Sequence, residues 1–218
     1  VHGHPHLADP AAAGSYLSAV AARIGAGDRG PGGVETHVHP NPEDNVAASI
    51  AAHAAELGAD LIVLCAHGAG GPRGWLAGVM AQQVIRRSTP PVLLVRPRPD
   101  GGAPPFAPRT VLVALDGTAH AATALPPALA LARALALPLD VAGVAPTPAA
   151  LDPGRAPTAS FKPTATAAAL DLEADALAAY LEEIATSARA AGLVARARPL
   201  RGDPGPGIAA LADRLGPA

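Results

Sequence analysis

The sequence predicts an α/β protein built on a parallel sheet, and two observations support this fold class. Short runs rich in β-branched residues alternate with alanine-rich amphipathic runs, which is the rhythm of strands and helices in α/β units. Two strand-like runs, 60–65 and 92–95, are continuously apolar, as expected for strands that are buried on both faces. Half of the 218 residues are apolar, so the chain can bury a sizeable core.

The elements follow one another in a regular order. Strands are predicted over 34–38, 60–65, 92–95, 110–115, 139–144 and 194–200, and helices over 45–57, 75–87, 119–137 and 170–191. The first helix should end at Gly58, because glycine favours the left-handed conformation that follows a helix. Pro126 and Pro127 weaken the third helix. Residues 97–108 have the composition of a linker between domains, and residues 145–163 that of a connecting loop.

Charge and cysteine content exclude several classes of function. The formal net charge is −2 with acids and bases interspersed, so we expect neither a nucleic-acid partner nor a membrane surface. No apolar run approaches the ~18 residues of a membrane span. Cys65 is the only cysteine, which favours a reducing, cytoplasmic location. Because the chain begins with Val1 rather than methionine, we expect it to be a piece of a longer protein.

An internal repeat links the two parts of the chain. Residues 41–59 are echoed by residues 203–218, each with a proline four residues before a β-branched residue and a Leu-Gly pair near the end. The first copy leads into the strand 60–65, whereas nothing like the strand 110–116 precedes it. The sequence therefore predicts the second part of one α/β unit followed by the first part of a similar unit.

The segments 59–68 (ADLIVLCAHG), 74–97 (GWLAGVMAQQVIRRSTPPVLLVRP) and 109–118 (RTVLVALDGT) resemble the universal stress protein family in a tandem arrangement. The resemblance implies an open parallel five-stranded sheet of order 3-2-1-4-5 with helices on both faces. It also implies two incomplete repeats, 1–96 and 110–218, joined by a linker at 97–109. The strands would then form either two partial repeats or one permuted sheet in which 110–116 lies beside 60–65.

Many members of this family bind ATP or AMP at the carboxyl edge of the sheet, through a Gly-x-x-Gly motif that is followed, after nine intervening residues, by Gly and then Ser or Thr. Cys65, Gly68, Gly78 and Val79 occupy these places here. The two central glycines match, and the first glycine and the hydroxyl residue do not. Arg73 in the same loop could compensate as a cation, and the place of His67 inside the loop favours a local hydrogen-bond partner over a base. Met80, directly after Val79, completes the candidate nucleotide-binding residues.

Asp116 matches the family aspartate that lies near the adenosine part of the nucleotide. Two alternatives stay open: the glycine segment is a turn that only lets strand and helix pack, and Asp116 or Thr118 is only the N-cap of the next helix. Where the permuted sheet forms, Asp116 and Gly68 would face one cleft. Whether Mg²⁺ accompanies the nucleotide is left open.

Alternating histidines suggest a second kind of site. His4 and His6 would follow one strand of the first repeat, and His37 and His39 lie at the end of the next, so the four are candidate metal ligands. The alternative, which the sequence favours, is solvated loop histidines beside prolines and no metal.

The sequence thus favours a non-enzymatic regulatory protein of the universal stress type with weak adenine-nucleotide binding. The alternative is a nucleotide-free dimerisation or interaction module. An enzyme, at most a slow ATPase, is disfavoured because no paired carboxylates or Ser–His arrangement are found. A homodimer is expected through the strand 91–95, which is short, apolar and expected at a sheet edge.

Overall fold

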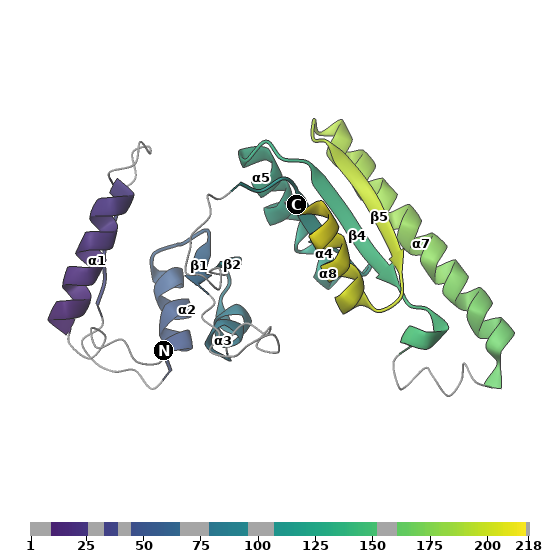
Figure 1. The fold of residues 1–218 in the computed structure, drawn as a ribbon, viewed down its shortest axis with the longest axis horizontal. Helices are drawn as coiled ribbons and strands as arrows, with labels where there is room; N and C mark the ends of the chain where they lie inside the picture. Colours follow the sequence, from purple (N-terminus) through teal and green to yellow (C-terminus); the bar gives the residue numbers. More distant parts are fainter. Residues whose placement is uncertain are drawn as a thin grey trace. The chain divides into compact units, whose positions relative to one another are not determined.

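A computed structural model describes residues 10–25, 33–38, 45–65, 79–95, 107–151 and 161–216. The chain divides into two compact units, Val1–Gly102 and Ala103–Ala218 (Figure 1). Within these residues the strands form two hydrogen-bonded sheets, one of two strands and one of three. A single permuted sheet of five strands is not among them.

The second unit contains a parallel sheet of order β3-β4-β5. Its strands are β3 (Val111–Ala114), β4 (Leu139–Ala145) and β5 (Ala195–Arg201). The register places Leu139 beside both Val111 and Ala195. β4 is the central strand, and six of its seven residues are buried, because neighbours on both sides and helices on both faces exclude water.

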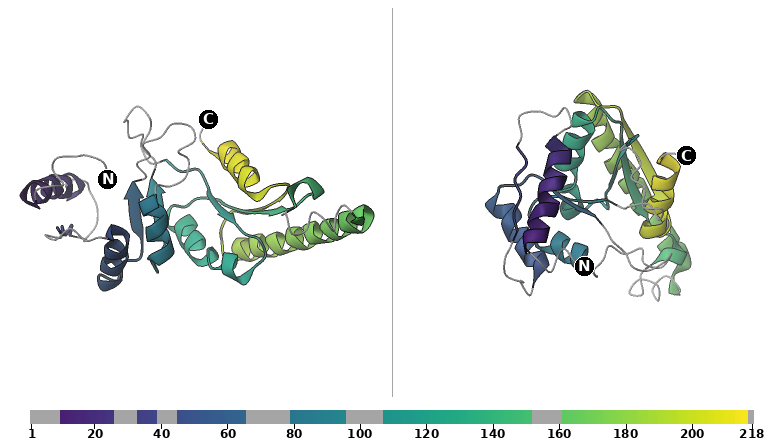
Figure 2. Two further views of the ribbon diagram at one scale, coloured as in Figure 1. Left: turned by 90° about the horizontal axis from the view of Figure 1, so that it is seen from below. Right: turned by 60° about the vertical axis from the view of Figure 1, so that its left-hand side comes forward.

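Helices cover both faces of this sheet (Figure 2). Its helices are α4 (Ala119–Ala122), α5 (Leu125–Ala134), the short 3₁₀ helix η2 (Pro148–Ala150), α7 (Pro163–Ala190) and α8 (Pro204–Leu215). α5 and α7 bury Ala132, Leu181 and Ala185 against β3 and β4 in the main core cluster. α8 packs on the opposite face, where Val144 lies 3.5 Å from the position of a Cβ on Gly207.

The first unit has a smaller core. Its elements are α1 (Pro10–Gly25), α2 (Val46–Glu56), β1 (Ile62–Cys65), α3 (Val79–Arg87) and β2 (Val92–Val95). β1 and β2 pair in parallel from Ile62↔Val92 to Cys65↔Val95. Ala47, Ala54, Ile62 and Val84 are buried between α2, α3 and one face of the two strands.

The expectation that β1 and β2 are buried on both faces is wrong for the described residues. Val63 is 58% exposed and Val95 45% exposed, whereas Ile62, on the opposite face, is buried. The crossover from β1 to β2 places α3 on one face of the pair, and α2 packs against α3. The other face therefore presents Val63, Cys65, Leu93 and Val95 as an apolar surface, which we call the open face.

Several other elements differ from the sequence-based expectation. Residues 33–38 form no strand; they are exposed and pair with no strand among the described residues. The helix expected over 119–137 is broken into α4 and α5, because Pro126 and Pro127 cannot continue a helix and instead occupy the first turn of α5. α1 was not predicted, and α7 begins at Pro163 rather than near Leu170.

The helix predicted over 75–87 is described from Val79 to Arg87, and its predicted start lies outside the described residues. The remaining predicted elements lie within two residues of their predicted ends. α2 ends at Glu56, and Gly58 follows with φ of +60°, which confirms the expected glycine after this helix. Of the helices in the described ranges, none is long and apolar enough to cross a membrane.

Candidate functional site

The chain leaves the sheet of the second unit immediately after β3. Leu115 is buried and its amide donates a hydrogen bond to the carbonyl of Ala142 at 2.8 Å. The next residue, Asp116, is exposed, and Gly117 has φ of +84°. A residue with a side chain is strained at this angle, so glycine allows the sharp turn. The turn presents Asp116 at the carboxyl end of a parallel strand, where open α/β sheets bind ligands.

Hydrogen bonds from Thr118 fix the carboxylate of Asp116. The Oδ1 atom accepts from the Thr118 hydroxyl at 2.7 Å and from the Thr118 amide at 2.9 Å. The Thr118 hydroxyl in turn accepts from the amide of Ala121 at 3.1 Å and so caps α4. Of the two N-cap candidates, Thr118 is therefore the cap and Asp116 orients it. No described residue hydrogen-bonds Oδ2, which is available to a ligand.

Asp116 is also a stronger acid than an ordinary aspartate. The hydrogen bond from the Thr118 hydroxyl, and then the one from its amide, hold the pKa of Asp116 below its usual value, because both stabilise the charged form. The side chain is therefore an anion with an oriented acceptor at neutral pH. Such a group can accept hydrogen bonds from hydroxyl or amino groups of a ligand.

Replacing Thr118 by valine is expected to raise the pKa of Asp116 toward the ordinary value, because valine has no hydroxyl to donate. Folding lowers this pKa, so the interaction stabilises the folded unit above about pH 3.9 and is lost as the pH falls through the lower folded value. A titration of the Asp116 carboxyl carbon by NMR measures the change. Thr123→Val is the control, since that hydroxyl bonds the carbonyl of His120; equal titration curves in all three proteins would contradict the assignment.

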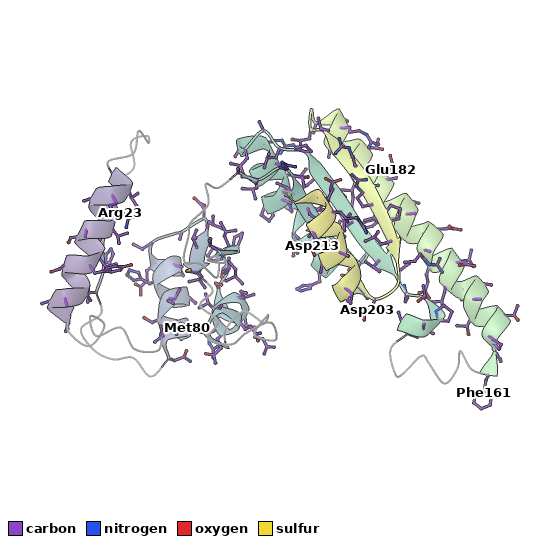
Figure 3. The ribbon with its side chains drawn as sticks, viewed as in Figure 1. Arg23, Met80, Phe161, Glu182, Asp203 and Asp213 are labelled. Atoms are coloured by element: carbon purple, nitrogen blue, oxygen red, sulfur yellow. The ribbon has the colours of Figure 1, made fainter. Side chains whose placement is uncertain are left out.

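The structure describes only part of the predicted phosphate site in the first unit. Cys65 is the last residue of β1 and carries an exposed free thiol. Val79 begins α3, and Met80 follows in its first turn with a half-buried side chain (Figure 3). His67, Gly68, Arg73 and Gly78 lie outside the described residues. The permuted sheet, on which the expected cleft shared with Asp116 depends, is not found among the described strands.

His37 is the one candidate metal ligand that lies in the described ranges; His4, His6 and His39 lie outside them. Its Nε2 is 3.6 Å from an oxygen of Glu35, and its ring meets that of His53 edge-on at 4.8 Å. Among the described residues no group of three or more potential ligands could hold a metal ion. His53 lies on α2, and no local pattern in the sequence predicted its contact with His37.

A comparison with models of known families matches the universal stress protein family in two segments, 6–96 and 108–218. The two segments together cover most of the chain. The chain belongs to the universal stress protein family. A search of curated proteins finds no match. Two matched segments agree with tandem universal stress repeats, and the parallel strands of both units agree with the α/β architecture expected from the resemblance.

Sequence reasoning missed the part that Gly117 and Thr118 play together. The motif Leu-Asp-Gly-Thr singled out Asp116 and offered either residue as a cap, but it did not show that one threonine serves both the carboxylate and the helix. The signal was present for one of the two bonds, because an aspartate side chain commonly accepts from the backbone amide two residues further on.

Proposed function

We propose that this universal stress protein is a regulatory protein that binds an adenine nucleotide, ATP or AMP, weakly. The observation that carries the proposal is the carboxylate of Asp116, held in one orientation at the carboxyl end of β3 with Oδ2 available. The position corresponds to the family aspartate near the adenosine. Its hydroxyl-accepting chemistry fits a ribose, which offers two vicinal hydroxyl groups.

The first unit supplies the candidate phosphate residues. β1 ends at Cys65, and α3 begins at Val79 after the glycine segment, which is the strand–loop–helix order of an anion-binding loop. Cys65 and Val79 replace a glycine and a hydroxyl residue of the family motif, so one phosphate donor is missing. We therefore expect weak binding, with Gly68 and Gly78 as the determinants and with Arg73 adding a cation. Mg²⁺ has no ligand set among the described residues, and we assign it no role.

Isothermal titration with ATP and AMP tests this function. We expect Asp116→Ala and Gly68→Val each to weaken the binding about tenfold, by removal of a ligand acceptor and by crowding of the loop. Asp175→Ala is the matched control, since Asp175 is an exposed aspartate on α7 whose loss changes the net charge equally. Absence of binding at millimolar nucleotide, or equal weakening in all three variants, would reject the proposal.

The second candidate is a nucleotide-free interaction module, and the open face favours it. A parallel sheet normally has both faces covered, yet Val63, Leu93 and Val95 are 58%, 38% and 45% exposed. β2 also has β1 as its one neighbour among the described strands, so no described strand pairs with the backbone donors and acceptors of its outer edge. A second copy of the chain, pairing along this edge, is the partner that we propose.

Replacing Leu93 by lysine is expected to shift the protein from dimer to monomer, because the charge would be buried in the interface without a partner. Sedimentation velocity at micromolar concentration measures the change. Leu131→Lys is the control: Leu131 is 45% exposed on α5 of the second unit, so it should leave the dimer intact. A wild-type monomer, or a dimer that Leu93→Lys leaves unaltered, would exclude this edge as the interface.

A further inference from the structure

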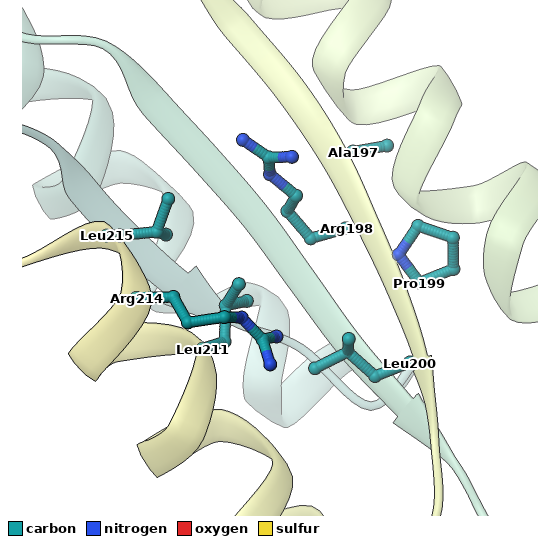
Figure 4. A pocket seen from close by; sticks show the side chains of 7 residues that line it. All are labelled: Ala197, Arg198, Pro199, Leu200, Leu211, Arg214 and Leu215. Atoms are coloured by element: carbon teal, nitrogen blue, oxygen red, sulfur yellow. The ribbon is translucent and has the colours of Figure 1, made fainter.

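A hollow of about 480 Å³ lies between α8 and β5 in the second unit (Figure 4). α8 packs mainly over β4, with Gly207 against Val144, and so leaves part of the same face of β5 uncovered. Leu200 from β5 and Leu211 and Leu215 from α8 form apolar walls. The volume is within the range of about 300–1,000 Å³ of small-molecule sites.

Two arginines line this hollow, and no carboxylate does so among the residues that the structure describes. Figure 4 shows the guanidinium of Arg198 pointing along the sheet and that of Arg214 lying between α8 and Leu200. The hollow therefore combines an apolar surface with cationic hydrogen-bond donors. It lies under α8, whereas Asp116 follows the carboxyl end of β3, so the two features involve different elements of the unit.

A buried carboxylate holds Arg198 in place. Asp140, whose side chain is 1% exposed, accepts from Arg198 Nε at 2.7 Å, and its other oxygen accepts from the hydroxyl of Thr110 at 2.7 Å. The bond uses Nε alone, so both terminal nitrogens of Arg198 have no hydrogen-bond partner among the described residues. Side-chain ordering on binding is costly, and this cation is already ordered.

The side chain of Arg214 carries a positive charge that no described carboxylate neutralises. This side chain makes no hydrogen bond or ion pair with any residue of the described ranges, whereas Asp140 neutralises Arg198. Arg214 lies in the last turn of α8, where a cation also interacts favourably with the helix dipole. The helix dipole explains why a cation lies near the end of α8. It does not explain why this cation lines an apolar hollow.

We propose that this hollow binds an organic anion with an apolar body, such as a medium-chain carboxylate. The carboxylate accepts hydrogen bonds from Arg214, with the terminal nitrogens of Arg198 as further donors for a ligand long enough to reach them. The chain of the ligand covers Leu200, Leu211 and Leu215. This site is independent of the proposed nucleotide function.

Isothermal titration of the intact chain with decanoate tests the site. Arg214→Gln is expected to weaken binding about tenfold, as loss of one charge-assisted hydrogen bond. Arg109→Gln is the matched control, because Arg109 is an exposed arginine of the same unit that does not line the hollow. Acetate, which has the charge without the apolar body, should bind at least tenfold more weakly than decanoate.

A second variant distinguishes the loss of a ligand contact from misfolding of the protein. Arg198→Lys keeps a cation beside Asp140 but removes the guanidinium fork, so we expect weaker decanoate binding with an unaltered circular dichroism spectrum. No heat with decanoate would overturn the proposal. Equal affinities of the wild-type protein, Arg214→Gln and Arg109→Gln would overturn it as well, since they would show binding to apolar surface elsewhere.

Discussion

Replacing Gly143 by alanine is expected to destabilise the second unit by about 2 kcal/mol, within the usual range for overpacking of a core. Gly143 lies in the central strand β4, where a Cβ would lie 2.8 Å from the carbonyl oxygen of Leu115 and 3.1 Å from the terminal methyl carbons of Leu177 and Leu181. The leucines can rotate away, but the carbonyl is part of the backbone of Leu115, which directly follows the neighbouring strand β3. The added methyl group must therefore push α7 or β3 out of place.

Urea unfolding followed by circular dichroism measures this loss. Gly207→Ala is the matched control, because a Cβ at Gly207 would be 3.5 Å from Val144, an ordinary contact. Gly207 is also inside α8, so alanine there should stabilise the helix by up to about 1 kcal/mol. A Gly143→Ala protein as stable as the wild type would show that α7 does not pack closely on β4.

Replacing Arg198 by methionine is expected to cost about 2–3 kcal/mol of unfolding free energy. Asp140 has a 1% exposed side chain and would be left with Thr110 as its one side-chain donor among the described residues. Removal of one partner of a fully buried ion pair costs about 3–5 kcal/mol. The expected loss is smaller here because the side chain of Arg198 is 35% exposed, so water can reach the site.

A double variant separates the ion pair from simple packing. Arg198→Met with Asp140→Val replaces both charges by apolar groups, and we expect it to recover most of the loss. Thr110 keeps a partner, since its hydroxyl also lies 3.0 Å from the carbonyl oxygen of Pro138. Arg201→Met is the control; its pair with Asp171 is at least 40% exposed on both sides and should contribute less than about 1 kcal/mol. A double variant as unstable as Arg198→Met would mean that the charges are not responsible.

Much of the fold was predictable because local patterns agree with the final packing. The strands near 62–65, 92–95, 111–114 and 139–145 were visible as runs with β-branched residues, whereas the strand at 195–201 contains none and was predicted from the run that starts at Val194. The predictions of strand formation and of burial failed where they depend on a neighbouring strand or helix. Residues 33–38 have a strand-like composition but no partner strand in the described ranges, and an apolar run such as β1 does not reveal which of its faces is covered.

The candidate site was predictable in part for the same reason. Asp116 follows a buried strand and precedes a glycine, which is a local signal. The pair of Asp140 and Arg198 was not predictable, because 58 positions separate the two residues and only the pairing of β4 with β5 brings them together. The open face of the first unit's sheet was not predicted. Its exposure depends on which helices cover β1 and β2, and the apolar sequence of a strand does not specify this.

The most direct test of nucleotide binding is to follow backbone amide signals by NMR while ATP is added to the intact chain. The proposal predicts saturable shifts at Gly117 and Thr118, which hold Asp116, together with shifts at Cys65 and Val79, and loss of these shifts in Asp116→Ala. Spectra that stay unaltered at millimolar ATP, or shifts confined to α8 and β5, would contradict it.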